Sequence, residues 1–309
     1  MALTPAYSTN LGTAYCADSL ELLPTLEDAS VDLVVTSPPY ALHFKKEYGN
    51  ADQHEYVEWF LPFAREIKRV LKPTGSFVLN IGGAWTPGAP VRSLYHFRLL
   101  LALCDELGFQ LCQEFFWYNP AKMPAPAEWV NVRRIRVKDS VEYIFWLASS
   151  QNPNADNSKV LQAYSRDMQR LIKRGIKQTK RPSGHNIKTT FAADKGGSIP
   201  PNIIECGNNE SNSRYIKESK RRGQKVHPAR FPAEIPRFFI EFLTEPGGLV
   251  LDPFAGSNTT GAVAEQLGRR WVSVERSIAY ATDSRLRFQQ LDEAPPEGEG
   301  GQLLLNLSD

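Results

Sequence analysis

A short polar turn follows the apolar run Val31–Thr36, and its four residues have the groups needed to hold a planar amine: Ser37-Pro38-Pro39-Tyr40. The Ser37 hydroxyl and the Pro38 carbonyl can accept hydrogen bonds from an exocyclic amino group. The two prolines lack an N–H donor and fix the backbone, and the Tyr40 ring can stack on a base. We therefore predict that all four residues act in catalysis at the amino group of a base.

A second turn with possible chemistry lies much later in the chain, after the apolar run Leu249–Asp252. The small residues Gly256 and Ser257 in this turn allow a ligand to approach the backbone closely. Asn258 can cap the helix expected next, whose free N–H groups suit a carboxylate. We predict that a cofactor binds here through Asp252, Phe254, Gly256, Ser257, Asn258 and Thr259.

Glu275 ends another strand-like run, residues 271–275, soon after this turn. At the end of a parallel strand, an acidic side chain can accept hydrogen bonds from ribose hydroxyl groups, as it does in dinucleotide-binding folds. We therefore add Glu275 to the predicted cofactor site. Ligands bind outside the carboxyl ends of the strands in open α/β sheets, so Ser37, Gly256 and Glu275 are expected at one sheet edge.

The order of apolar segments predicts an α/β fold. Runs rich in β-branched and aromatic residues indicate strands at residues 31–36, 76–81, 111–118, 141–148, 249–252 and 271–275. Apolar residues at helical spacing indicate helices at residues 56–71, 92–107, 232–243 and 259–267. Strands that alternate with helices favour a doubly wound, mainly parallel sheet.

The alternation stops in the middle of the chain. Residues 149–225 are polar, basic and rich in turn-forming residues, which favours an inserted module over another strand–helix unit. The last residues have few apolar side chains and are expected to be disordered. We therefore divide the chain into residues 1–148 (target-base half of the catalytic domain), 149–225 (recognition module), 226–290 (cofactor-binding half) and 291–309 (tail).

Charge is uneven along the chain, although the net charge of the 309 residues is only +2. Residues 159–195 have ten Lys and Arg against two Asp and Glu, and residues 217–230 have six against one. Such blocks are commonly solvated faces. Beside a turn that grips a base, however, they favour a surface that faces phosphates.

The four cysteines, Cys16, Cys104, Cys112 and Cys206, show no Cys-x-x-Cys spacing, and no histidine cluster accompanies them. Neither a metal site nor a disulfide framework is therefore expected, and a reducing cytoplasm is the predicted location. The N-terminus has no basic segment followed by an apolar one, and no apolar run approaches the length of about 18 residues that spans a membrane. These features predict a soluble protein without a membrane partner.

The target-amine turn comes first in the chain and the cofactor turn last, an order that resembles the permuted, beta-group amino-methyltransferases of DNA. Further segments look like the PvuII-type modification methyltransferases of that family, which methylate the exocyclic N4 amine of cytosine. These segments are residues 45–50, 128–131, 134–139, 181–185 and 197–202. The resemblance covers residues 10–290 and departs from the family at Ser257, where a second glycine is usual.

The resemblance implies a circularly permuted, seven-stranded methyltransferase sheet, S-adenosylmethionine as the cofactor, and a flipped cytosine of double-stranded DNA as the substrate. It places Asp18 on the adenine amine of the cofactor; the alternative role of Asp18 is the N-cap of the next helix. It assigns His227 to a segment that closes over the cofactor. It also implies a restriction-modification setting, with a cognate endonuclease that acts on the same site without a stable complex. The DNA-contacting side chains are expected among Arg133, Arg134, Arg136, Lys173, Arg174, Lys177, Lys180 and Arg181.

The sequence leaves alternatives open. Ser37, in place of Asp or Asn, favours cytosine N4, but an adenine-N6 methyltransferase of the same fold is an alternative. No Pro-Cys pair occurs, which disfavours the covalent thiolate route to carbon 5 of cytosine. A methyltransferase of RNA or of a protein glutamine would normally have the cofactor turn first. A non-catalytic DNA-binding protein would have no reason to keep both turns.

Overall fold

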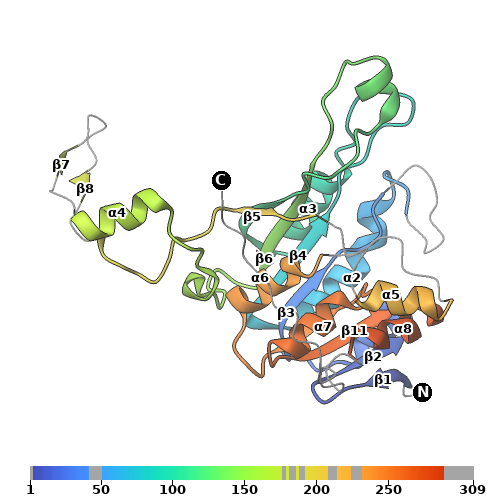
Figure 1. Ribbon diagram of the computed structural model, residues 1–309. Helices are drawn as coiled ribbons and strands as arrows, with labels where there is room; N and C mark the ends of the chain where they lie inside the picture. The colour runs from blue at the N-terminus through green and yellow to red at the C-terminus, as the bar shows by residue number, and fades with distance from the viewer. Residues whose placement is uncertain are drawn as a thin grey trace.

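A computed structural model of the protein has one large β-sheet with helices on both faces (Figure 1). It describes residues 3–41, 51–175, 179–180, 186–187, 192–207, 214–223 and 232–288. The strands are β1 Pro5–Ser8, β2 Gly12–Cys16, β3 Val31–Thr36, β4 Leu71–Ile81, β5 Gln110–Tyr118, β6 Val141–Ala148, β7 Thr179–Lys180, β8 Asn186–Ile187, β9 Ile203–Glu205, β10 Leu249–Asp252 and β11 Arg270–Glu275. The helices are α1 Ser19–Leu22, α2 Tyr56–Val70, α3 Tyr95–Asp105, α4 Arg166–Arg174, α5 Arg214–Arg221, α6 Glu234–Leu243, α7 Thr259–Gln266 and α8 Ile278–Asp283.

The main sheet has the order β1-β2-β11-β10-β3-β4-β6-β5-β9 within the described residues. The strands from β2 to β4 run parallel, and β6 is antiparallel to both β4 and β5. The seven strands from β2 to β5 match the predicted sheet, and the short strands β1 and β9 extend it at its two edges. Because β10 and β3 are hydrogen-bonded neighbours, the two turns that are distant in sequence come together.

Alternate side chains of the central strands enter two hydrophobic cores, one on each face of the sheet. In β4, Phe77 and Leu79 pack in the core that contains α2 and α3, whereas Val78 packs in the core that contains α6 and α7. All three side chains are fully buried. Burial on both faces is typical of parallel strands covered by helices, and it holds the strand ends in fixed positions.

Several predicted elements match the structure closely, and two begin elsewhere. The strands expected at residues 31–36, 141–148 and 249–252 coincide with β3, β6 and β10. β4 begins at Leu71 rather than at residue 76, directly after α2 ends. α3 begins at Tyr95 and not at residue 92, because Arg92 forms an antiparallel bridge with Trp85.

The segment of residues 149–225 has parts with different surroundings. α4 and the β7–β8 pair project from one side of the molecule (Figure 1). β9, in contrast, pairs with β5 at an edge of the main sheet, and α5 packs against the turn Ser284–Arg287. The sequence pattern missed β9 because a three-residue edge strand has little apolar periodicity. The division into domains stays a prediction.

None of the helices in the described ranges has the length and apolar character of a membrane-spanning segment. The four cysteines are free, and the same part of the chain contains no group of three or more side chains that could hold a metal ion. The tail that we expected to be disordered, residues 291–309, lies outside the described residues.

Candidate active site

Polar side chains gather at one edge of the main sheet, where neighbouring strands present them in order. The carboxyl ends of β2, β11, β10, β3 and β4 lie at this edge, together with the amino end of the antiparallel strand β6. The polar residues at or just after these strand ends are, in the same order, Asp18, Glu275, Asp252, Ser37, Asn80 and Glu142. Ligands of open α/β sheets bind at such an edge, which here contains both predicted turns.

Asp252 joins the two turns through its side chain. Its Oδ1 accepts a hydrogen bond from Thr36 Oγ1 at 2.7 Å, just before Ser37, and its Oδ2 accepts from Thr260 Oγ1 at 2.7 Å. Phe254 N also donates to Oδ1, at 3.1 Å. Asp252 is only 4% exposed, and burial raises its pKa to about 6. This carboxylate therefore lies beneath the two turns and fixes their spacing.

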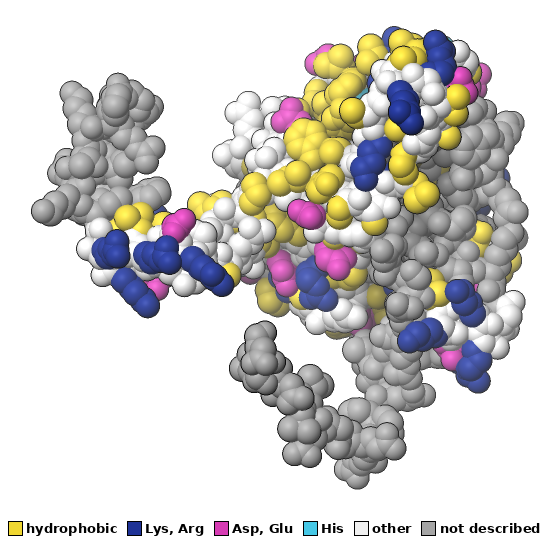
Figure 2. Space-filling view, turned by 45° about the horizontal axis from the view of Figure 1, so that its top comes forward, with side chains coloured by type: hydrophobic (Ala, Val, Ile, Leu, Met, Phe, Trp, Pro, Cys, Tyr) yellow, Lys and Arg dark blue, Asp and Glu magenta, His cyan; other side chains and the backbone are white. Residues whose placement is uncertain are grey.

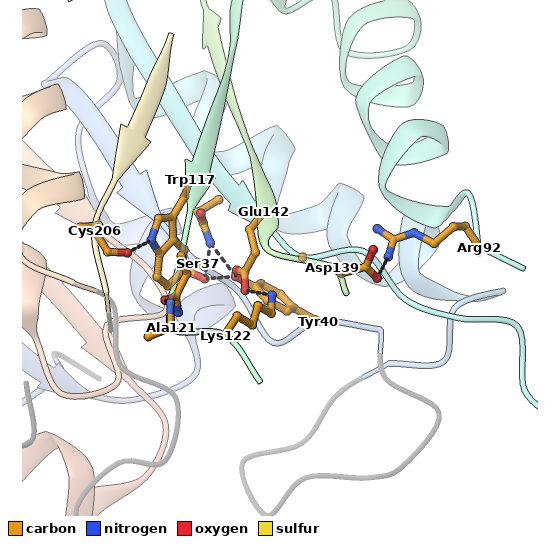
Figure 3. A network of polar contacts seen from close by, with 12 residues as sticks. Ser37, Tyr40, Arg92, Trp117, Ala121, Lys122, Asp139, Glu142 and Cys206 are labelled. Carbon is orange, nitrogen blue, oxygen red and sulfur yellow. Dashed lines mark hydrogen bonds and ion pairs between the residues drawn. The ribbon is translucent and has the colours of Figure 1, made fainter. Parts of the chain in front are cut away.

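The hydroxyl groups of Ser37 and Tyr40 belong to a connected network of polar side chains (Figure 3). Ser37 Oγ lies 3.1 Å from Tyr40 Oη, which donates to Glu142 Oε2 at 2.7 Å. Asn80 Nδ2 donates to Tyr40 Oη at 2.5 Å and to Ser37 Oγ at 3.3 Å. Lys122 Nζ donates to the other carboxylate oxygen, Glu142 Oε1, at 2.8 Å. Side chains from four segments of the chain therefore meet at the predicted catalytic residues.

The hydrogens available in this network set the direction of its bonds. Tyr40 has one hydroxyl hydrogen and donates it to Glu142, so its oxygen accepts from Asn80 and from Ser37. The Ser37 hydrogen therefore points toward Tyr40, and Ser37 Oγ offers a lone pair to another donor. Burial, and then the charge of Glu142, raise the pKa of Tyr40 well above its usual value, so the phenol keeps its proton.

The backbone of the turn at residues 37–40 is held by a side chain of α2. Tyr56 Oη in α2 donates to Pro39 O at 2.8 Å, and Pro38 is buried. A Cβ atom at Gly82 would lie 2.5 Å from Tyr40 Cε2. Glycine at this position therefore allows the Tyr40 ring to lie against the loop that follows β4.

The expected cofactor residues lie beside this network. Glu275 Oε2 accepts from Gly256 N at 2.9 Å, and its Oε1 accepts from Ser277 N at 2.7 Å. Each carboxylate oxygen has a further lone pair for a ligand hydroxyl group, and Glu275 lines a small hollow together with Tyr15 and Gly256. Burial raises the pKa of Glu275. These residues fit a nucleoside whose ribose hydroxyls donate to Glu275.

Asp18 and Gly256 have backbone roles in the same region. Asp18 Oδ1 accepts from Leu20 N at 2.9 Å and is the N-cap of α1, which is the alternative role considered from the sequence. Its second carboxylate oxygen is not used by this cap. Gly256 has a φ of 52°, in the left-handed region that favours glycine, so a larger residue would strain the turn.

Two polar residues of the cofactor turn bind other parts of the protein. Asn258 Oδ1 caps α7 by accepting from Gly261 N at 3.1 Å, and it also accepts from Ser273 Oγ at 2.6 Å. Ser257 Oγ accepts from Arg287 at 3.0 Å. Both residues are almost fully buried. Their side chains therefore stabilise the turn from within.

Phe254 and Thr259, two other residues of the predicted cofactor site, contribute an apolar ring and a buried hydroxyl group, respectively. Phe254 packs among the aromatic rings of α2, with its ring centroid 5.0 Å from that of Phe63. Thr259 Oγ1 is buried and has no hydrogen-bond partner among the described residues. His227, predicted to close over the cofactor, lies outside the described residues.

The predicted basic residues lie in two projecting parts of the molecule. Arg133 and Arg134 are exposed in the projecting segment, residues 119–140, which connects β5 with β6 and rises from the edge that contains the catalytic turn (Figure 1). Lys173 and Arg174 are exposed at the end of α4, where basic side chains follow one another along the arm (Figure 2). Of the remaining residues, Lys180 belongs to β7, and Lys177 and Arg181 lie outside the described residues.

Arg136 is held within the projecting segment. Its guanidinium carbon lies 3.7 Å from the centroid of the Trp85 ring. Arg92 lies 5.1 Å from the same ring and forms an ion pair with Asp139 at 2.5 Å. These contacts join the loop after β4 to the projecting segment, which gives Arg136 a structural role there.

Three members of the polar network around Ser37 and Tyr40, namely Asn80, Lys122 and Glu142, were not predicted from the sequence. Asn80 and Glu142 are polar residues within otherwise apolar strands, and each lies close to the strand end at the site. A polar residue near the end of an apolar strand was the sequence signal that could have identified Asn80 and Glu142. Their meeting with Lys122 and Tyr40 depends on the pairing of β6 with β4 in the antiparallel direction, which the sequence pattern does not specify.

The parallel strands β2 to β4, the antiparallel strand β6 between β4 and β5, and the helices on both faces form an S-adenosylmethionine-dependent methyltransferase fold. Residues 31–285 match the DNA methylase family of N6 and N4 methyltransferases, and the chain belongs to this family. It is 52% identical over 287 residues to the Type II methyltransferase M.PvuII of Proteus hauseri, covering 92% of this chain and 85% of that protein. It is 30% identical over 278 residues to the Type II methyltransferase M.ScaI of Streptomyces caespitosus, covering 88% and 79%.

Solved structures are similar in fold. The cytosine-N4-specific PvuII DNA methyltransferase superposes with a TM-score of 0.76 at 46% identity, over 93% of this chain and 89% of that one. A putative DNA modification methylase of Thermus thermophilus, in complex with S-adenosyl-L-methionine, superposes with a TM-score of 0.54 at 22% identity, over 90% and 94%. The second similarity supports the fold alone.

Proposed function

We propose that the protein is a site-specific DNA methyltransferase that transfers a methyl group from S-adenosylmethionine to the exocyclic N4 amine of cytosine. One observation carries this proposal: Ser37 offers a lone pair at the sheet edge that also contains the Gly256 turn, which follows the neighbouring strand and is bound to Glu275. An exocyclic amine has N–H groups to donate to Ser37, whereas a ring carbon has none that matches them. Similarity to a cytosine-N4-specific enzyme favours cytosine over adenine.

The target base must leave the duplex to reach this edge. A base inside a duplex cannot present its amine to an enclosed site, so the nucleotide is flipped out at a cost of a few kcal/mol. The half-buried Tyr40 ring supplies a surface for stacking. Its hydroxyl is already fixed by Glu142 and Asn80, so the ring is in position before the base arrives.

Positioning supplies most of the catalysis in this proposal. An aromatic amine is a poor nucleophile because its lone pair is delocalised into the ring. Hydrogen bonds from the amine to Ser37 Oγ and to the Pro38 carbonyl favour a tetrahedral nitrogen and aim its lone pair for in-line attack. Asn80 Oδ1 is buried without a hydrogen-bond partner among the described residues, and it is a further acceptor at this site.

The cofactor residues have matching roles. S-adenosylmethionine supplies a methyl group on a positively charged sulfur, and the bond pair stays on sulfur when the methyl group leaves. Glu275 would accept from the ribose hydroxyls, and the backbone at Gly256 would lie close to the cofactor. Asp18 would accept from the adenine amine with the oxygen that its cap does not use. His227 would belong to the segment that closes over the cofactor.

Duplex DNA would lie across the edge, between the projecting segment and the α4 arm. The exposed basic residues of both parts would contact phosphates or base edges. The projecting segment also exposes apolar side chains, with Val137 85% and Met123 77% exposed, and exposed apolar groups that cluster mark interaction surfaces. Hydrophobic and basic side chains lie side by side at the top of Figure 2. Lys177, Lys180 and Arg181 are included in this proposed surface.

The proposed setting is a cytoplasmic restriction-modification system. The enzyme would methylate the site that a cognate endonuclease cuts, and the two proteins would share that site without forming a stable complex. The Type II names of the two relatives are consistent with this setting.

The function is tested by incubating the purified protein with S-adenosylmethionine and duplex DNA and analysing the nucleosides by mass spectrometry. We expect N4-methylcytosine. N6-methyladenine would move the assignment to the adenine alternative, and 5-methylcytosine or the absence of any methylated nucleoside would contradict the proposal. Sequencing of the product with detection of modified bases then gives the recognition sequence.

A further inference from the structure

We propose that Glu142 accepts the proton that the target amine must lose, and that this proton reaches it through Ser37 and Tyr40. The inference rests on the proposed function. Glu142 lies on β6, outside both sequence turns, and acts on the amine through two intervening hydroxyl groups.

The direction of the hydrogen bonds carries this inference. Ser37 donates to Tyr40 over 3.1 Å, and Tyr40 donates to Glu142 Oε2 over 2.7 Å. When an amine donates to Ser37 Oγ, the amine, Ser37, Tyr40 and Glu142 form a row of hydrogen bonds. Every hydrogen in this row points toward the Glu142 carboxylate. Such a row can pass a proton along its length without any side chain changing its partner.

The surroundings hold Glu142 in place as the end of this row. Its side chain is 16% exposed, and Lys122 binds the oxygen that Tyr40 does not use, at 2.8 Å. Figure 3 shows the nearby carboxylate of Asp139 apart from the network, in its ion pair with Arg92. The high pKa of Tyr40, caused first by burial and then by the charge of Glu142, keeps the phenol protonated and able to relay a proton.

The target amine must lose a proton because methylation leaves its nitrogen positively charged. Once N4 has formed its bond to the methyl carbon, the nitrogen has four bonds and a positive charge. N4 gives one proton to Ser37 Oγ, the Ser37 proton moves to Tyr40 Oη, and the Tyr40 proton moves to Glu142 Oε2. The amine becomes neutral, both hydroxyl groups are restored, and Glu142 becomes a carboxylic acid that later releases the proton to water.

The test compares Glu142→Gln, Tyr40→Phe and the double variant in single-turnover methyl transfer to duplex DNA. Each single change should lower the rate at least ~100-fold, the low end for loss of general base catalysis. Because both changes interrupt the same row, the double variant should be no slower than the slower single variant. Affinity for S-adenosylmethionine and base flipping, followed by 2-aminopurine fluorescence, should stay at wild-type values.

The control is Glu66→Gln, which breaks an ion pair of similar length, 2.8 Å to Arg69, in a carboxylate that is 27% exposed and lies on α2. It should keep the wild-type rate. A wild-type rate in Glu142→Gln, or strictly additive losses in the double variant, would overturn the inference. If Glu142→Gln failed to fold, a wild-type rate in Tyr40→Phe would overturn it as well. Absence of methyl transfer by the wild-type protein would instead contradict the proposed function.

Discussion

The two halves of the polar edge differ in how their side chains are used. In the cofactor half, Asp252 and Asn258 are buried and bind only other protein groups, so most polar atoms there hold the turns together. In the target half, Ser37 donates to Tyr40 and Tyr40 donates to Glu142, so Ser37 Oγ keeps a lone pair that can accept a hydrogen bond from a ligand. Substitutions in the cofactor half should therefore change stability or cofactor binding, whereas those in the target half should change the rate of methyl transfer.

Gly256→Val is expected to have the largest effect on the cofactor half. Gly256 has a φ of 52° and lies beside Glu275, so a β-branched side chain would both strain the backbone and block the approach of the cofactor. Calorimetry should find no binding of S-adenosylmethionine to this variant. Gly247→Val is the control, because Gly247 also has a positive φ, 79°, but lies at the opposite end of β10. Equal loss of binding in both variants would contradict a local role for Gly256.

Asp252→Asn should change the pH dependence of stability. The pKa of Asp252 is raised to about 6 by burial, above the value of about 3.9 in an unfolded chain. The wild-type carboxyl therefore contributes most to stability below about pH 4, and this contribution is lost as the pH rises through about 6. The oxygen of an asparagine can accept from Thr36 and Phe254 as Asp252 Oδ1 does, and its NH2 group can donate to Thr260 Oγ1 without any charge.

The free energy of unfolding of Asp252→Asn, relative to wild type, should therefore rise by up to about 3 kcal/mol between pH 4 and pH 7. Urea denaturation at intervals across this range measures the difference, in which the titration of other groups cancels. A difference that stays constant with pH would show that Asp252 does not titrate there. Such a result would weaken the conclusion that buried polar groups of the cofactor half act mainly on stability.

Glu275→Ala should have a smaller effect, limited to the cofactor. Loss of charge-assisted hydrogen bonds to the ribose should raise the dissociation constant for S-adenosylmethionine ~10-fold. Calorimetry measures this constant, and Glu245→Ala, which removes an exposed carboxylate paired with Lys159, should leave it unchanged. Unchanged affinity in Glu275→Ala would move the ribose contact to another residue.

Lys173→Ala should have the smallest effect, because it lies on the α4 arm outside both halves of the edge. Removal of one phosphate contact should weaken binding to all DNA sequences and make the slope of log affinity against log salt shallower by about one unit. Lys159→Ala is the control, since Lys159 is bound to Glu245 at 2.5 Å. An unchanged slope in Lys173→Ala would identify this part of the arm as a solvated face.

The sequence predicted the strands and turns that form the site better than the contacts between its side chains. The apolar runs of β3 and β10 were recognisable because they are continuous and end in polar turns, and their adjacency brought Ser37 and Gly256 to one edge as expected. The pattern also placed Glu275 correctly at a strand end. Strand ends are readable because burial of a strand requires an uninterrupted apolar run.

The partners of each side chain could not be predicted in the same way. Asp252 and Asn258, which we assigned to the cofactor site, also bind the buried side chains of Thr260 and Tyr7, which only the folded structure brings near. Glu142 reaches Tyr40 because β6 is antiparallel, so that its amino end lies at the site. Such contacts follow from strand order and direction, which local periodicity does not encode.

We infer that the target half performs the chemistry without holding the fold or the cofactor. The test is Ser37→Ala, with the single-turnover rate of methyl transfer, the affinity for S-adenosylmethionine and the unfolding free energy measured on the same preparation. We predict a rate at least ~10-fold lower, as expected when one positioned polar contact is removed, with cofactor affinity and stability unchanged. A folded Ser37→Ala protein that transfers methyl groups at the wild-type rate would contradict the account.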